Sequence, residues 1–313
     1  MSEQIEKDKI YNCDCLEDEV SPDNTGETTD GKGKMRPELQ KKIDHAIRLL
    51  KAYDNPEQPI EIAYSGGKDS DVILQLAKEA GIHYRAIYRN TTIDPPGTIK
   101  HAEENGCEIL QPRKYTFRQL IAKRGLPSRF RRFCCQELKE YKVGDKCVMG
   151  IRRVESPARM KNYLEPSQCR FYGSKKEHVE AVYPILEWTD EDVVEFLTAR
   201  KVKVHALYYR EDGTIDPKRR LGCMCCPLAS TKHRIEEFKR YPGMVKLYLK
   251  AYQEFLDTHP NCSAAKLHAD AYEGLVHDVF FPGSREWAQV SDGLFGKPDF
   301  KAFLEKQFGI SLG

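Results

Sequence analysis

The sequence predicts an α/β fold: a parallel twisted sheet with helices on both faces, followed by a mainly helical C-terminal part. An apolar run at 60–64 leads through a glycine-rich turn into the helical pattern of 71–77. Strand-like and helical segments then alternate, which is typical of a parallel sheet, and residues after about 231 keep mostly helical spacing. The strand-like segments are 84–88, 108–110, 146–151 and 181–186, and the helical windows include 37–52, 98–105 and 117–124.

This pattern divides the chain into three parts. Residues 1–35 form a polar N-terminal arm without an apolar period, residues 36–230 form the domain that contains the glycine-rich turn and the alternating segments, and residues 231–313 form a helical extension. The arm contains Cys13 and Cys15, which alone lack the four ligands of a closed metal site. We therefore assign no role to that pair.

Composition restricts the class of protein. Among 313 residues, 50 Lys and Arg nearly balance 48 Asp and Glu, so any nucleic-acid surface must be local rather than a consequence of net charge. No stretch approaches the roughly 18 apolar residues that span a membrane, and residues 1–4 begin no signal peptide. We expect a cytoplasmic protein without membrane contact, in which eleven cysteines serve metal or redox chemistry rather than disulfides.

The turn at 65–70 reads Ser-Gly-Gly-Lys-Asp-Ser and has the properties of a phosphate site. Gly66 and Gly67 let the backbone approach an anion, the following helix offers free N–H groups, and Lys68 adds a positive charge. The spacing is neither that of a Walker A loop nor Gly-x-Gly-x-x-Gly. It resembles the PP-loop of ATP pyrophosphatases, which grips the pyrophosphate of ATP while AMP passes to a substrate oxygen. The alternative is a plain surface turn.

Cysteine spacing gives a second signal. Cys134 and Cys135 are adjacent, and Cys223 and Cys226 form a C-x-x-C pair far downstream. Adjacent cysteines do not easily ligate one small tetrahedral ion, but they can bridge two irons of a cubane, so the four thiolates predict a [4Fe–4S] cluster. A structural zinc ion or buried unligated thiols are the alternatives, and Cys225 is a spare thiol beside the site.

Several motifs in order resemble the phosphoadenosine phosphosulfate (PAPS) reductase superfamily over roughly residues 55–230. They are the loop at Ser65, Asn90-Thr91-Thr92 with Pro95-Pro96, Cys134-Cys135, the segment 150–159 (Gly-Ile-Arg-Arg-Val-Glu-Ser-Pro-Ala-Arg), the segment 184–193, and Gly222-Cys223-x-x-Cys226. The resemblance implies an adenine-nucleotide α-hydrolase-like fold. It also implies that Arg152, Arg153 and Arg159 bind sulfate or phosphate, as bidentate guanidinium groups do. Each arginine could instead be a solvated surface charge.

Two departures from the family decide which activity the resemblance implies. The assimilatory reductases carry a catalytic cysteine in a C-terminal Glu-Cys-Gly-[Leu/Ile]-His motif, whereas the last cysteine here is Cys262. The intact loop retains Lys68 and Asp69, which indicates that ATP is still cleaved. We take Lys68, Asp69 and Ser70 as catalytic, and Ser65, Gly66 and Gly67 with them as phosphate-binding.

The resulting hypothesis is an ATP- and Mg²⁺-dependent enzyme that adenylates a substrate oxygen for sulfur transfer, nearest to the DNA phosphorothioation branch. Its expected partners are ATP, a nucleic acid (DNA or tRNA) and a cysteine desulfurase as sulfur donor, and a homo-oligomer is left open. Basic residues at 123–133 and 217–220 flank both cysteine pairs, and Phe130 and Phe133 could stack on bases. The same charges could merely be solvated or balance an anionic cluster.

Two other classes remain as alternatives. A reductase acting on PAPS or adenylyl sulfate would release sulfite and would need Cys15, Cys225 or Cys262 as its nucleophile. A non-catalytic nucleotide-sensing subunit would not need an intact loop.

Overall fold

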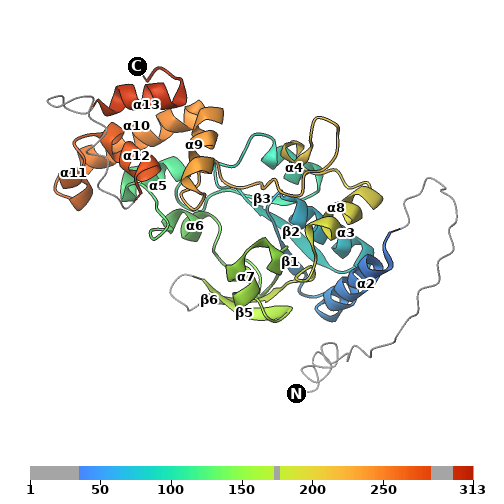
Figure 1. The fold of residues 1–313 in the computed structure, drawn as a ribbon. Coiled ribbons are helices and arrows are strands. Elements are labelled where there is room, and N and C mark those ends of the chain that lie inside the picture. Colours follow the sequence, from blue (N-terminus) through green and yellow to red (C-terminus); the bar gives the residue numbers. More distant parts are fainter. Residues whose placement is uncertain (1–34, 173–176, 283–298, 313) are drawn as a thin grey trace.

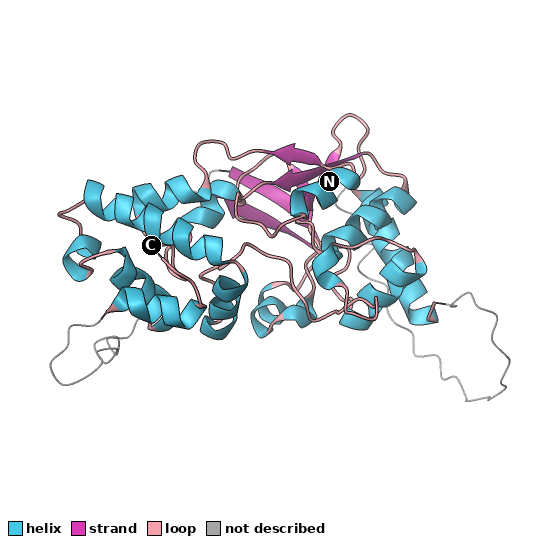
Figure 2. Cartoon of the chain, turned by 90° about the horizontal axis from the view of Figure 1, so that it is seen from above, coloured by secondary structure: helices cyan, strands magenta, loops and turns pink. Residues whose placement is uncertain are grey.

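The computed structural model describes residues 35–172, 177–282 and 299–312. Cys13 and Cys15 lie outside these ranges. Within them, no helix is both long enough and apolar enough to cross a membrane. The helical C-terminal part stands beside the six-stranded sheet rather than on one of its faces (Figures 1 and 2). The fold class is therefore α/β with a helical C-terminal part, as predicted.

The sheet has the strand order β3-β2-β1-β4-β6-β5, in which β1 through β4 and β6 run parallel and β5 pairs antiparallel with β6. The strands are β1 (Ile60–Tyr64), β2 (Tyr84–Arg89), β3 (Glu108–Leu110), β4 (Lys146–Val148), β5 (Ser167–Tyr172) and β6 (Glu177–Val182). The antiparallel edge strand β5 was not predicted. The expected strand at 146–151 ends at residue 148, and the one at 181–186 starts earlier, at residue 177.

One face of the sheet carries the main core. Ile60, Ile62 and Tyr64 of β1 alternate toward this face and join a buried cluster with residues of α2 (Pro37–Ala52), α3 (Lys68–Ala80) and α8 (Asp190–Ala199). The opposite face is more polar. Glu61 forms an ion pair of 2.6 Å with Arg89 of β2, and Tyr141 lies against that guanidinium, so the segment around Tyr141 helps to cover this face.

The remaining helices build the second part of the molecule. Helix α5 (Phe117–Arg124) packs against α10 (Pro242–Thr258), and α6 (Phe133–Leu138) contributes Phe133, Cys134 and Leu138 to the same core. The other helices are α4 (Thr98–Glu104), α7 (Pro157–Asn162), α9 (Thr231–Arg240), α11 (Ser263–Leu267), α12 (Ala271–Phe280) and α13 (Phe300–Phe308), with short 3-10 turns η1 (Arg153–Glu155) and η2 (Ala206–Tyr208). The helical core thus begins before residue 231 in the chain, and the division at residue 230 stays a prediction.

The strand order also locates a ligand site. From β1 the chain moves through β2 to β3 on one side, and β4 then pairs with β1 on the other side. In open parallel sheets, ligands bind beyond the carboxyl ends of the strands at such a reversal. The residues that follow β1 (65–70) and β4 (149–152) meet there.

Candidate nucleotide site and cysteine cluster

The loop after β1 adopts the geometry that its glycines predict. Gly66 has φ +75°, in the left-handed region that glycine favours, and Gly67 is the residue before α3. The Ser70 hydroxyl donates to the Gly67 carbonyl at 2.7 Å and lies 3.3 Å from the Ser65 hydroxyl. These bonds fix the turn at the N-terminus of a helix of 13 residues, where backbone N–H groups are free to face an anion.

Lys68 is buried at the start of α3, with 2% of its surface exposed. Its ammonium group lies 3.4 Å from the Asp69 carboxylate and 5.5 Å from the centre of the Tyr208 ring. A buried ammonium beside loop N–H groups is a fixed positive charge, and it is suited to bind a multiply charged phosphate.

A buried polar network holds the first turn of α3 in place. Asp71 is 2% exposed and accepts hydrogen bonds from the Tyr64 hydroxyl at 2.5 Å and from His101 Nε2 at 3.0 Å. Burial raises the pKa of Asp71, while His101 and Tyr64 act in the opposite direction. The network connects β1, α3 and α4, and it holds the loop without contacting the face that would meet a ligand. Sequence analysis did not single out Asp71.

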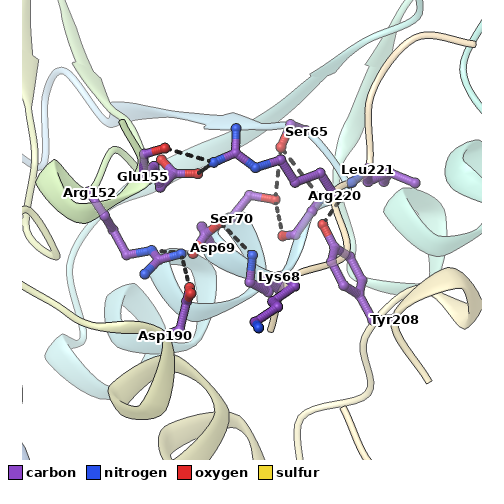
Figure 3. A network of polar contacts seen from close by, with 12 residues as sticks. Ser65, Lys68, Asp69, Ser70, Arg152, Glu155, Asp190, Tyr208, Arg220 and Leu221 are labelled. Atoms are coloured by element: carbon purple, nitrogen blue, oxygen red, sulfur yellow. Dashed lines mark hydrogen bonds and ion pairs between the residues drawn. The ribbon is translucent and has the colours of Figure 1, made fainter. Parts of the chain in front are cut away.

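Arg152 is the predicted anion-binding arginine that the structure brings to the loop. Its guanidinium donates to Asp69 at 2.7 Å and to Asp190 at 2.8 Å and is only 1% exposed (Figure 3). Gly150 makes this approach possible, because a Cβ there would lie 2.9 Å from the Asp69 backbone. Arg152 is thus already paired with two carboxylates, and its visible role is to orient Asp69.

The other two arginines lie differently. Arg153 donates to the carbonyls of Tyr163 and Leu164 and pairs with Glu187, so it holds a loop and is not directed at residues 65–70. Arg159 pairs with Glu155. Burial, together with the charge of Arg220, lowers the pKa of Arg159.

Arg220 was expected only as part of a basic surface run. It lies across the loop region in Figure 3 and donates to the Glu155 backbone carbonyl at 3.0 Å. Arg159 and Arg220 therefore share Glu155 and form a second positive group beside the loop. Its signal in the sequence was only the run of three basic residues at 218–220.

The four cysteines predicted as ligands approach one another. Hydrogen bonding to Cys135, burial, and the nearby thiols of Cys223 and Cys226 raise the pKa of Cys134. The hydrogen bond from Cys134 and the charge of Arg132 lower the pKa of Cys135 to about 6. Thiols from two segments about ninety residues apart in the chain are thus gathered at one place. Over 35–172, 177–282 and 299–312, however, no three His, Cys, Asp or Glu side chains are spaced to hold a single metal ion.

The cysteine cluster and the nucleotide loop are connected through the segment that follows β2. The Cys223 thiol lies 3.7 Å from the Thr91 hydroxyl, and the Met224 N–H donates to Ile93 at 2.8 Å. Cys225 is fully buried with φ +55°, and its backbone bonds with Glu237, Arg234 and Tyr248 place it in the helical core. Cys225 is therefore a packed residue in this structure.

The two aromatic residues that were expected to stack on bases differ in exposure. The Phe130 ring is 98% exposed, whereas Phe133 is buried in the helical core, so the expectation that Phe133 stacks on a base is wrong. Arg124 and Arg132 pair with Glu137 and Glu140, which reduces the free positive charge of this surface.

Fold and loop together define a nucleotide-binding α/β protein of the PP-loop type. The phosphoadenosine phosphosulfate reductase domain matches residues 59–229, more than half of the chain, and the chain belongs to that family. Membership of the DNA phosphorothioation branch, which the sequence led us to expect, is not shown by its relatives.

Among its relatives, an uncharacterized protein of Methanocaldococcus jannaschii is 26% identical over 71% of this chain and 55% of its own length. An uncharacterized 37.8 kDa protein of Escherichia phage 186 is 32% identical over 43% of this chain and 42% of its own length. Sulfate adenylyltransferase subunit 2 of Mycolicibacterium gilvum is 26% identical over 56% of this chain and 65% of its own length. The chain spans about half the length of the archaeal relative.

Among solved structures, the FMN adenylyltransferase of Candida glabrata is similar, with 18% identity and a TM-score of 0.39 over 55% of this chain and 59% of that protein. A likeness of this size says nothing about substrate.

Proposed function

We propose that the protein cleaves ATP between the α- and β-phosphates and transfers AMP to an oxygen of an acceptor that is then thiolated. The observation that carries this proposal is the intact loop 65–70. The loop follows β1 at the point where the strand order of the sheet reverses, and Lys68 is buried at its end. The relative from Mycolicibacterium gilvum supports adenylyl transfer, because its name describes that reaction.

The residues of the loop would perform distinct tasks. Backbone N–H groups of the loop and of the first turn of α3, together with the Lys68 ammonium, would hold the pyrophosphate, which leaves as the α–β bond breaks and the acceptor oxygen bonds to the α-phosphorus. Asp69 is oriented by the hydrogen bond from Arg152, and the Ser70 hydroxyl fixes the turn. Arg159 and Arg220 would add positive charge at the outer phosphates once Glu155 releases one of them.

Mg²⁺ commonly binds through nucleotide phosphates and one or two carboxylates. Asp69 is the carboxylate that the structure places on the loop, and it would be the protein ligand. The ion would neutralise charge that builds on the phosphates.

Cys134, Cys135, Cys223 and Cys226 would hold the [4Fe–4S] cluster. The donor chemistry fits this group, since thiols from two distant segments come together around Cys134 at the edge of the helical core. Such a cluster would supply iron that binds sulfur. Zinc is the competing metal for the same thiols, although no three donor side chains of the described residues are spaced to hold one ion.

For the acceptor, we propose a nucleic acid, as in DNA phosphorothioation, with a cysteine desulfurase as the source of a persulfide. The outer sulfur of the persulfide would displace AMP from the adenylated acceptor, and a second thiol would then cleave the resulting disulfide and release the thiolated product. Phe130 supports this proposal. Its aromatic ring is fully exposed on a loop with Arg129 and Arg131, four residues before Cys134 in the chain, and could stack on a base. Sulfate is the second candidate acceptor, favoured by the relative from Mycolicibacterium gilvum.

The test is to purify the protein anaerobically and to incubate it with ATP, Mg²⁺ and, separately, DNA, tRNA, sulfate or adenylyl sulfate. We expect AMP release that one of the nucleic acids stimulates and that Lys68→Ala abolishes. The matched control is Lys78→Ala, at an exposed lysine in the last turn of the same helix. Stimulation by sulfate alone would favour the second candidate, and sulfite release from adenylyl sulfate without ATP consumption would make the protein a reductase.

The metal proposal has its own test. Iron and sulfide analysis with a visible spectrum should show a cluster that is lost in Cys134→Ser and Cys226→Ser and retained in Cys169→Ser, at an exposed thiol of β5. Zinc in place of iron would contradict it.

A further inference from the structure

A tyrosine that no motif singles out closes the nucleotide loop. Tyr208, the last residue of η2, is 2% exposed, and its side chain lies beside Lys68 and Leu221 (Figure 3). A Cβ built on Gly67 would lie 3.2 Å from that hydroxyl oxygen. The phenol is therefore in van der Waals contact with the part of the loop where a bound phosphate would sit.

The hydroxyl has a defined hydrogen-bonding role. Its oxygen accepts the Leu221 N–H at 3.1 Å. Among the described residues, no acceptor receives the hydrogen of this hydroxyl. Burial raises the pKa of Tyr208 to about 12, while the backbone N–H groups of Leu221 and Lys68 act in the opposite direction. The phenol thus stays protonated and keeps one O–H to donate at the mouth of an anion site.

The ring has a second role, because its face lies 5.5 Å from the Lys68 ammonium. A cation over an aromatic face is attracted to it, most strongly where water is excluded. Leu221 completes the arrangement, since its side chain comes within 3.1 Å of a Cβ position on Gly66. The segment 206–221 therefore presses one hydroxyl and one aromatic face onto the loop.

We propose that Tyr208 is a pyrophosphate-binding residue: its O–H donates to a β- or γ-phosphate oxygen, and its ring holds Lys68 in place for the same group. This inference rests on the proposed function, because it assumes that the loop binds the pyrophosphate of ATP. It assigns to the site a donor that is not part of the Ser-Gly-Gly-Lys-Asp-Ser motif.

The test compares Tyr208→Phe with Tyr209→Phe by calorimetric titration with ATP, inorganic pyrophosphate and adenosine. Tyr209 is the matched control, because its hydroxyl accepts the Val204 N–H at 3.3 Å instead of facing the loop. Loss of a hydrogen bond to a charged group should weaken ATP and pyrophosphate binding by about tenfold or more in Tyr208→Phe and leave adenosine binding unchanged. Tyr209→Phe should bind all three like the wild type.

Equal pyrophosphate affinity in the wild type and Tyr208→Phe would overturn the inference and leave the proposed function standing. A wild type that binds neither ATP nor pyrophosphate would overturn both. If Tyr208→Phe does not fold, a single fluorotyrosine at position 208 replaces it. Its fluorine resonance should shift during a pyrophosphate titration of the full chain, and a resonance that stays fixed at saturation would refute the inference.

Discussion

Replacing Gly66 by alanine should damage both the stability of the fold and the nucleotide site. The residue has φ +75°, and an L-residue in the left-handed region costs about 1–2 kcal/mol. The new Cβ would lie 2.8 Å from Thr98 Cγ2 and 3.1 Å from Leu221 Cδ2. Thr98 cannot easily move, because it is buried and its hydroxyl donates to the Pro95 carbonyl at 2.7 Å. Overpacking of this kind costs about 1–3 kcal/mol more, so the total loss is about 2–5 kcal/mol.

Gly81→Ala provides the matched control at the other end of the same helix. Gly81 has φ +65°, yet a Cβ there would meet nothing within 4 Å. It should lose only the backbone contribution of about 1–2 kcal/mol, and ATP binding should survive. Urea unfolding gives the free energies, and calorimetric titration gives the ATP affinities. Equal losses of stability in the two variants, with ATP binding intact in Gly66→Ala, would refute the packing described for the loop.

Three further predictions concern other parts of the molecule. Arg152→Met leaves Asp69 with one fewer cationic partner in a buried site, so it should lower the unfolding free energy by about 3–5 kcal/mol in urea titrations; a loss below 1 kcal/mol would contradict the buried pairing. Burial and the neighbouring His277 lower the pKa of His268 to about 4, from the 6.5 that is usual for histidine. The contribution of His268 to stability is therefore fully present above about pH 6.5 and should be lost as the pH drops toward 4. The unfolding free energy should fall less steeply over this range in His268→Gln than in the wild type, and the same pH profile in both would refute the prediction. Phe130→Ala should leave the melting temperature unchanged, because the ring is 98% exposed, but weaken single-stranded DNA binding in a fluorescence titration; unchanged binding would remove the stacking role.

The nucleotide loop could be predicted because its signal is local. Strand, glycines, lysine and helix follow one another within twenty residues, and the structure reproduces that order from β1 to α3. The cap of α8 is a similar case, since Thr189 and Asp192, only three residues apart, form reciprocal hydrogen bonds. Such features depend on neighbours in the chain and not on the tertiary fold.

Residues whose roles depend on distant parts of the chain could not be assigned in this way. Arg152 and Arg153 are adjacent, yet one orients Asp69 and the other binds carbonyls at residues 163 and 164, because Arg152 has an extended backbone whereas Arg153 begins the 3-10 turn η1. Phe133 follows a basic run but turns into a core formed with α10, which only the packing of α5 and α6 against the C-terminal helices reveals. Tyr208 lies some 140 residues from the loop it contacts.

Transfer of AMP requires cleavage of ATP between the α- and β-phosphates, so the first experiment should identify the bond that is cleaved. With ATP labelled at the α-phosphate, in the presence of Mg²⁺ and the stimulating acceptor, the account predicts labelled AMP and unlabelled pyrophosphate from the wild type and from Lys78→Ala, and neither from Lys68→Ala. Labelled ADP with inorganic phosphate, or AMP formation that survives in Lys68→Ala, would contradict it.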